Sequence, residues 1–491
     1  MGIWSELMSR LQFDSWYSAR YRELTRLMLT LKRQQYNHLP HPFHQETESG
    51  GGYIPLSERR PSIIYPLPSI IARDVSNKLF SGRHFPYLTG DMELTESLEK
   101  LAKTSNLTPT MKYAAYIGSV GSVFISFDII DKQFYFKAWE SRYCEPVFDS
   151  TGELISVHIR YQCPVDALYA LGYKFKNPQE WYWFGCAFTQ TDHIVYSPFD
   201  ETEPPPWNDW AVDAANSRKH NLGFVPGVWI YNITSGDVPD GICTFDNLLD
   251  LTVEIDYQLS QTGRGFKYSA APQLAISGPS TLGIGRTAVI RSPSNYIELY
   301  PGSKDTPPGK AALLEMKGSG LREAVEYVKL LRAYALEASA GSRRDPERLT
   351  AIPMSGKAME LLDEDELDLI QSLRVTYGTQ GLLPLLRKCI RAASILDIIS
   401  NLSEDKLKDV DLIWTKVFLP SSSEIQQFAV GLVQAVQIGM ISLETAADLF
   451  SIFLDLPHPI KGTGHVEAVE KQETPPAVPP EQVPEKGVKN D

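Results

Sequence analysis

Two helical segments that enclose a β-type insertion constrain the fold of this chain more than any other feature of its sequence. Residues 244–262 and 321–339 carry apolar side chains at helical spacing, and the first of these helices is expected to end near Gly263. Residues 266–318, between them, hold short β-type runs broken by Gly and Pro. The chain must therefore leave a helical pair and re-enter it, with the insertion projecting from one end.

Residues 122–196 consist of aromatic-rich segments in which apolar and polar residues alternate, with short turns between the segments. The segments are VFISFDII, FYFKAW, ISVHIRY, YWFGCAF and HIVYS, and the later run FVPGVWIYN adds one more. They predict a mainly antiparallel β region. Helices are predicted before it, over residues 15–35, from a capping Ser69 to Gly82, and from Thr108 to Gly118.

The last third of the chain reads as a loop followed by helices. Residues 340–356 carry Gly and Pro and predict a loop, and a helical tract then begins near Lys357. That tract contains the acidic run 363–366, expected to be a solvated helix face, and is punctuated by Gly378 and Gly381. A strand-like LIWTKVFLP, two helices and a Pro-, Glu- and Lys-rich tail with too little apolar surface to fold complete the chain.

Composition limits the classes of protein to which this chain can belong. Its 47 Lys and Arg against 60 Asp and Glu give a formal net charge of −13, which argues against holding nucleic acid by bulk positive charge. The 5 cysteines are far apart with no CxxC pair, so they predict buried free thiols in a reducing compartment. No segment is long and apolar enough to cross a bilayer, so we expect a soluble protein without a membrane partner.

Motifs of enzyme chemistry are missing from the sequence. The segment GPSTLGIGRT, which begins at Gly278, lacks the Lys of a phosphate loop, and a Gly-rich turn is the simpler interpretation. There is no HExxH, no GxSxG elbow and no compact set of metal ligands; His41 and His44 stand in a Pro-rich loop. We therefore expect no enzyme, no catalytic residue, no cofactor and no metal.

The order of these parts resembles the portal proteins of tailed bacteriophages, from about Tyr53 to Leu454. The pieces that carry the resemblance are YIPLSERRPSIIYPLPSIIARDVSNKLF, YAAYIGSVGSVFISF and CEPVFDSTGELISVHIRY, then LLDLTVEIDYQLS, a β-rich stretch, LREAVEYVKLLRAYALEAS, a loop and SGKAMELL. The resemblance implies an α+β portal fold with a mixed α/β wing, a two-helix stem, a small β-rich clip and a helical crown, in a ring-forming homo-oligomer.

The resemblance also assigns each part of the chain. The implied parts are an N-terminal wing 1–243, a first stem helix 244–265, a clip 266–318, a second stem helix 319–339, a tunnel loop 340–356, a C-terminal wing 357–420, a crown 421–458 and a disordered tail 459–491. About twelve subunits would form a ring at one capsid vertex of the virion, after assembly in the host cytoplasm.

In that family, double-stranded DNA is packaged and ejected through the channel of the ring, without base-specific contacts. The implied channel residues are Arg343, Arg344, Arg348 and Lys357, and more weakly Lys329 and Arg332. For Lys329 and Arg332, a salt-bridged exposed face with Glu326 is an equal alternative. The clip residues implied in docking are Arg291, Tyr296, Glu298, Tyr300 and Lys304. The implied partners are the terminase large subunit, head-completion or adaptor proteins, and the major capsid and scaffolding proteins.

Two other functions remain open from the residues alone. Trp181, Tyr182 and Trp183 cluster in one predicted strand, which suits a carbohydrate-binding or hydrolytic β-domain enzyme, although aromatics in strands are usually core. A monomeric scaffold or adaptor would instead use the amphipathic helix 15–35 to bind partner helices.

Overall fold

The computed structural model describes residues 2–89, 92–175, 178–201, 203–236, 239–270, 273–277, 310–314, 318–339, 364–396, 410–417, 420 and 422–454. The chain divides into two compact units. Unit 1 comprises Met1–Arg343 and Asp365–Leu412, and unit 2 comprises Arg344–Glu364 and Ile413–Asp491.

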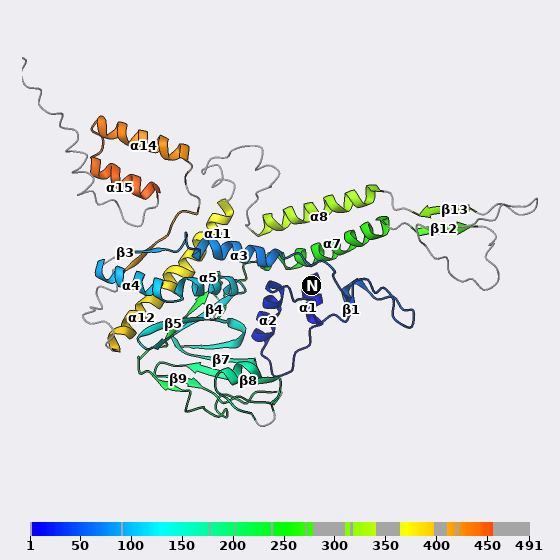
Figure 1. The fold of residues 1–491 in the computed structure, drawn as a ribbon, viewed down its shortest axis with the longest axis horizontal. Coiled ribbons are helices and arrows are strands. Elements are labelled where there is room, and N and C mark those ends of the chain that lie inside the picture. The colour runs from blue at the N-terminus through cyan, green and yellow to red at the C-terminus, as the bar shows by residue number, and fades with distance from the viewer. Residues whose placement is uncertain are drawn as a thin grey trace, which may run out of the picture. The chain divides into compact units, whose positions relative to one another are not determined.

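Two antiparallel sheets form the centre of unit 1 (Figure 1). The three-stranded sheet has the order β11 (Gly227–Tyr231), β4 (Ser122–Ile130), β5 (Gln133–Glu140). The five-stranded sheet has the order β10 (Arg218–Lys219), β9 (Asp192–Val195), β8 (Trp181–Phe188), β7 (Leu154–Pro164), β6 (Cys144–Phe148). All neighbouring strands in both sheets are antiparallel, which confirms the predicted β region.

The two sheets share one hydrophobic core. Phe124, Trp139 and Trp229 of the three-stranded sheet belong to the same buried cluster as Val157 and Phe188 of the five-stranded sheet. Alternate side chains of a strand face opposite sides, so Trp139 of β5 meets this core, whereas Phe134 and Phe136 are buried on the other face of the strand. Together with the helices described below, the sheets confirm a mixed α+β fold.

The 5 cysteines are all buried and free. Burial raises the pKa of each thiol, and the pKa of Cys186 reaches about 12. A protonated, buried thiol is a poor nucleophile, so these residues serve packing, as the sequence predicts.

Helices cover the three-stranded sheet on the side away from the five-stranded one (Figure 1). Helix α5 (Leu107–Gly118) packs on β4 and β5, and α3 (Leu67–Phe80) packs on α5. The prediction that Ser69 caps α3 is wrong: the helix begins at Leu67, and the Ser69 hydroxyl lies inside it, 3.2 Å from the Tyr116 hydroxyl. Helix α4 (Met92–Thr104) was not predicted.

The tract containing Gly378 and Gly381 stays helical. Helix α11 (Glu364–Arg374) passes through the π-helical turn η4 (Val375–Leu382) into α12 (Leu383–Ile395). A Cβ on Gly381 would lie 2.6 Å from the side chain of Ile230 in β11, so this glycine permits close packing instead of ending the helix. The acidic run is not wholly solvated either, because Glu366 is buried against Lys78.

The N-terminal segment forms α1 (Ile3–Ser9) and α2 (Ala19–Leu31), the latter shorter than the predicted 15–35 because the Ser18 hydroxyl caps it by accepting the Tyr21 N–H at 3.1 Å. Leu24, Met28 and Leu31 of α2 are buried within the subunit. This face is therefore occupied, which removes the basis for the adaptor interpretation. The other short elements are β1 (His41–Pro42), η1 (Leu56–Glu58), β2 (Arg59–Arg60), β3 (Tyr87–Thr89), η2 (Ser141–Tyr143), α6 (Val165–Ala170), η3 (Asp246–Leu248) and β14 (Asp411–Ile413).

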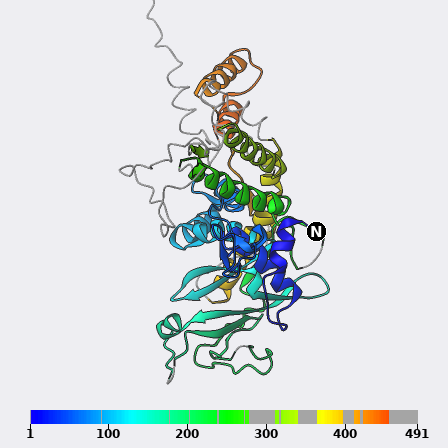
Figure 2. The ribbon, with the colours of Figure 1, turned by 90° about the vertical axis from the view of Figure 1, so that its right-hand side faces the viewer.

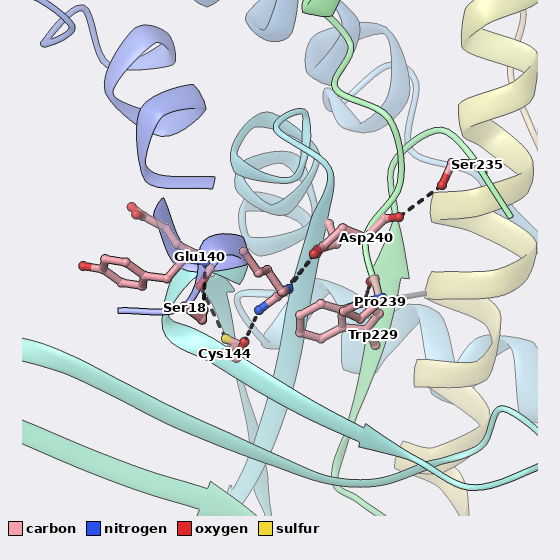
Figure 3. Close-up of polar contacts among 10 residues, drawn as sticks. Ser18, Glu140, Cys144, Trp229, Ser235, Pro239 and Asp240 are labelled. Carbon is pink, nitrogen blue, oxygen red and sulfur yellow. Dashed lines mark hydrogen bonds and ion pairs between the residues drawn. The ribbon is translucent and has the colours of Figure 1, made fainter. Parts of the chain in front are cut away.

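Arg20 attaches α2 to both sheets through Cys144 and Asp240, which are labelled in Figure 3. Its guanidinium donates to both carboxylate oxygens of Asp240, at 2.5 and 2.8 Å, and to the carbonyl of Cys144 at 2.6 Å. The Asp240 carboxylate also accepts from the Ser122 hydroxyl, and the Arg20 guanidinium lies 5.6 Å from the centroid of the Trp229 ring. A bidentate, charge-assisted pair fixes direction as well as distance, so this one side chain sets how α2 meets the sheets.

Unit 2 contains a helical hairpin of α14 (Ser422–Gln437) and α15 (Leu443–Leu454). The rings of Phe428 and Phe453 stack across it with centroids 4.0 Å apart. The Ser442 hydroxyl caps α15 by accepting the Thr445 N–H at 3.1 Å.

We predict that Arg20→Ala lowers the free energy of unfolding by about 2–3 kcal/mol, because Asp240 is mostly buried and would lose its countercharge. Lys103→Ala is the control, since Lys103 forms an exposed pair with Glu99 worth about 0.5 kcal/mol or less. Chemical denaturation of both variants measures the difference, and equal stability of the two would contradict the role given to Arg20.

Candidate functional site: the paired helices α7 and α8

Two long helices of unit 1 form an arm that carries a pair of strands at its far end. Helices α7 (Leu249–Ala270) and α8 (Gly318–Ala338) lie side by side in both views (Figures 1 and 2). Strands β12 (Gln273–Ser277) and β13 (Lys310–Leu314) follow α7 and precede α8, and they pair antiparallel from Gln273↔Leu314 to Ser277↔Lys310. The chain thus leaves and re-enters the helical pair at one end, as the sequence predicts.

The prediction that the first helix ends near Gly263 is wrong, because α7 continues to Ala270. A glycine inside a helix costs about 1 kcal/mol relative to alanine, which tertiary contacts of the helix can offset. Several polar contacts hold α7 against the N-terminal part of the chain over the three turns before Gly263.

The central contact is a buried carboxylate, Asp256, on α7. One of its oxygens accepts hydrogen bonds from the Tyr36 hydroxyl at 2.8 Å and from the Gln35 amide at 3.4 Å. The other accepts the backbone N–H of Tyr65 at 2.6 Å. Asp256 therefore joins three segments that are far apart in the sequence.

Three other polar residues of α7 also form hydrogen bonds with the N-terminal part of the chain. The Asp250 carboxylate accepts the Trp4 N–H at 2.7 Å, and the Ser260 hydroxyl accepts the Ile63 N–H at 3.0 Å. The Tyr257 hydroxyl donates to the carbonyl of Arg59 at 3.0 Å. We call Asp250, Asp256, Tyr257 and Ser260 the polar ladder; it fixes the helix against residues 4–65 and so fixes where the arm begins.

Burial raises the pKa of the Asp256 carboxyl to about 7, although the hydrogen bonds from Tyr65 and Tyr36 act in the opposite direction. The same burial, together with the charge of Asp256, raises the pKa of Tyr36 so far that its hydroxyl stays a donor. The ladder therefore contains one group that changes charge near neutral pH.

Helix α8 has one buried and one exposed apolar face. Leu331 and Ala335 of α8 are buried, and α8 packs on α7. Tyr327, Leu330 and Tyr334, spaced by three and four residues, are exposed by 44%, 45% and 52%. We call these three residues the α8 stripe; an apolar row of this kind on a single helix is typical of a surface that another chain covers.

The weakly predicted channel residues Lys329 and Arg332 lie on α8 and are both exposed. Lys329 pairs with Glu326 at 3.1 Å, both side chains being more than half exposed, which is the salt-bridged alternative considered above. An exposed pair of this kind adds little stability and leaves both groups in solvent.

The other predicted site residues lie outside the described part of the chain. These are the channel residues Arg343, Arg344, Arg348 and Lys357 and the clip residues Arg291, Tyr296, Glu298, Tyr300 and Lys304. The expected loop 340–356 and the disordered tail 459–491 also lie there.

The aromatic cluster that motivated a carbohydrate-binding alternative is mostly core. Tyr182 and Trp183 are buried, and Trp183 packs edge-on against Trp16 at a centroid distance of 5.3 Å. Only Trp181 of the three is exposed. The three rings therefore do not form one exposed aromatic surface.

Among the described residues, no group of three or more His, Cys, Asp and Glu is placed to hold a metal ion. Within the same residues, no helix has the length and apolar content needed to span a membrane.

The comparisons with known proteins give similarity to solved structures alone. No family model matches this chain, and neither does any curated protein. Among solved structures, a chain of the "Virion of native gene transfer agent (GTA) particle" is similar, with 12% sequence identity and a TM-score of 0.39 over 91% of this chain and 98% of that chain. A TM-score this low does not show a shared fold, and the similarity carries no inference about function.

Sequence reasoning missed the polar ladder. A signal was present, because Asp256 and Ser260 continue the buried row that begins with Leu249 and Val253 at steps of four, three and four residues. A carboxylate in an otherwise apolar helical row indicates a buried hydrogen-bonding partner, but the sequence does not reveal that the partners are Tyr36 and Tyr65.

We predict that Asp256→Asn removes a pH dependence of stability. The folded-state pKa of about 7 lies above the ordinary value of 3.8, so between these pH values the folded state binds more protons than the unfolded state does. The stability that the protonated Asp256 carboxyl contributes is therefore fully present below about pH 4 and is lost as the pH rises through 7. Asn keeps an oxygen for the Tyr65 N–H and cannot ionise.

The measurement is denaturant unfolding of both proteins at pH 5 and pH 8. Relative to the wild type, Asp256→Asn should gain about 2 kcal/mol of stability between the two conditions. Because other groups such as Glu366 titrate in both proteins, the difference between them isolates this carboxyl. Parallel pH profiles would show that Asp256 is ionised throughout.

Proposed function

We propose that this chain is the portal protein of a tailed bacteriophage. It would form a ring of about twelve subunits at one capsid vertex of the virion, through which double-stranded DNA is packaged and ejected. The ring would dock the terminase large subunit and later head-completion or adaptor proteins, within a shell of major capsid and scaffolding proteins. The observation that carries the proposal is the α7–β12–β13–α8 arm, together with the sequence resemblance.

The arm supports the proposal because it ends in an antiparallel pair of strands. β12 and β13 pair from Gln273↔Leu314 to Ser277↔Lys310, so the chain leaves β12 and enters β13 at one end of the arm. A strand pair carried at the end of two helices is suited to docking a partner on one side of a ring, because strand edges can pair with partner strands.

The α8 stripe supports assembly with further copies of the same chain. A stripe on one helix that meets a different surface of the next subunit makes a head-to-tail contact, and such contacts close into rings when the rotation permits. Tyr327 and Tyr334 supply large apolar area with few rotatable bonds, which favours them at interfaces.

The negative net charge of the chain suits a channel through which DNA passes. A net charge of −13 repeated around a ring repels DNA phosphates, so a duplex can slide without being held. Arg343, Arg344 and Arg348 would give local, sequence-independent contacts in the tunnel loop. We also propose that the chain performs no catalysis of its own, because no phosphate loop with its Lys is present in the sequence.

We predict that the double variant Leu330→Glu, Tyr334→Glu converts the ring into monomers, because two carboxylates would be buried without partners at the subunit contact. Both side chains are about half exposed in the subunit, so its fold should survive. The control is Leu171→Glu, at an exposed apolar residue in the turn after α6.

Mass photometry and circular dichroism measure the outcome. The wild type and the Leu171→Glu variant should both be rings, and the double variant should be a folded monomer. Rings of the double variant would show that the α8 stripe is not the contact, whereas a monomeric wild type at micromolar concentration would contradict the proposed function itself.

We predict that Arg343→Ala, Arg344→Ala and Arg348→Ala together leave ring assembly intact and reduce DNA packaging or retention. Each arginine lost should remove about one phosphate contact, which carries a salt slope near −0.9 on duplex DNA. The matched control removes three exposed cations elsewhere, Lys174, Arg218 and Lys219. Packaged DNA length and retention equal to those of the control would reject the channel role of these arginines.

A further inference from the structure

A pocket of about 550 Å³ lies where the polar ladder of α7 ends. One wall is the last described part of α7, and the other is formed by β1, β2 and the residues that follow each of them, beneath α7 in Figure 1. Its volume falls in the range of small-ligand sites. Nothing in the proposed function uses this pocket.

Among the described residues, cations line the pocket and no carboxylate does. Arg60 comes from β2, and Arg264 and Lys267 come from α7, where their spacing of three places them on one face. His44 adds an imidazole to the wall. Such a concentration of positive charge is notable in a chain with a net charge of −13.

The fold directs one of two adjacent arginines into the pocket and buries the other. Alternate residues of a strand face opposite sides, and β2 consists of Arg59 and Arg60. Arg59 is buried and donates to the Phe43 carbonyl at 3.2 Å and to the Tyr53 hydroxyl at 3.1 Å. Arg60 is exposed, and no hydrogen bond or ion pair of its side chain occurs within the described part of the chain.

The cations of the pocket are incompletely neutralised. Glu46 lies 2.5 Å from Arg264 and 3.7 Å from Arg59, so one carboxylate is shared between two guanidinium groups. Lys267, like Arg60, forms no ion pair with any described residue. An anion that entered the pocket would find two cations without a carboxylate partner and a third that is held in place.

Another part of the wall is apolar. Pro42, Phe43 and Pro61 line the pocket, and a proline ring fixes its backbone angle, while Ser62 and Ser260 add hydroxyl groups. Guanidinium groups match the oxygens of a phosphoryl group in a forked geometry, whereas an ammonium acts as a point charge. The combination fits a phosphoryl group attached to a less polar body, such as a nucleoside or a sugar–phosphate backbone.

We infer that this pocket binds a phosphoryl group, through Arg60, Arg264 and Lys267. The source is either a small phosphorylated molecule or the backbone of a nucleic acid, since both present the same oxygens. Binding is electrostatic in large part, so it weakens as salt concentration rises.

The test uses the full-length protein with three probes: inorganic phosphate, adenosine monophosphate and a short DNA duplex, each titrated by calorimetry. The variant is Arg60→Gln with Lys267→Gln, two exposed side chains with no ion pair among the described residues, so folding should be unaffected. The control is Arg218→Gln with Lys219→Gln on β10, which removes the same charge from another exposed site of unit 1.

We expect at least one probe to bind the wild type and the control equally and to bind the Arg60→Gln, Lys267→Gln variant more than about tenfold more weakly. Loss of phosphate and adenosine monophosphate binding assigns the pocket to a small molecule, and loss of duplex binding alone assigns it to a nucleic-acid backbone. Affinities that are unchanged in this variant, or reduced as much in the control, or absent for all three probes, would overturn the inference.

The oligomeric state of each sample is measured in parallel. Intact rings that lack the pocket-dependent binding would refute the phosphoryl site and leave the proposed function standing. Conversely, monomers that bind phosphate through Arg60 and Lys267 would support the site and contradict the ring.

Discussion

The hydrogen bonds of one buried carboxylate, Asp256, fix the part of this protein on which its proposed function depends. A carboxylate is costly to bury unless donors surround it, and here the Tyr36 hydroxyl, the Gln35 amide and the Tyr65 N–H provide them. Because these donors come from two separate segments, α7 can satisfy Asp256 in only one position. The energetic requirement of a single buried group thus becomes a geometric requirement on the whole helix.

The consequences extend along the helix in both directions. Toward its N-terminus, Asp250 holds α1, and toward its C-terminus, Ser260 holds Ile63 and brings β2 beside the next turn. The basic pocket begins where these backbone contacts stop, and the α8 stripe lies on the partner helix. Arg20 fixes the position of α2 against the sheets in a similar way, because its charged side chain binds Asp240 and Cys144, which are far from it in the sequence.

The sequence predicts the helices and strands whose apolar residues recur with a regular period, and it does not predict contacts between distant residues. The aromatic alternation of residues 122–196 identifies the strands correctly, since period-two patterning reflects a local property of the backbone. Gly381 does not end its helix because Ile230 packs closely against it from elsewhere in the chain, and α7 continues past Gly263 because distant residues such as Tyr65 hold it by hydrogen bonds. The burial of Glu366 and Asp256 is not predicted either, because their partners lie far from them in the sequence.

The candidate site was predictable to the same extent. Spacing predicts that residues 244–262 and 321–339 are helices enclosing a β-rich stretch, and the structure has α7, β12, β13 and α8 in that order. Spacing cannot show that Arg59 and Arg60 face opposite ways, because this depends on the pairing of β2 with β1. The phosphoryl pocket and the α8 stripe therefore emerge only from the three-dimensional arrangement.

The most direct test of the proposed function is electron microscopy of the purified full-length protein. We expect class averages of a closed ring with a central opening, in which the α7–α8 arms of neighbouring subunits lie side by side. Particles of single-subunit size without an opening, at a concentration where portal rings would be complete, would contradict it.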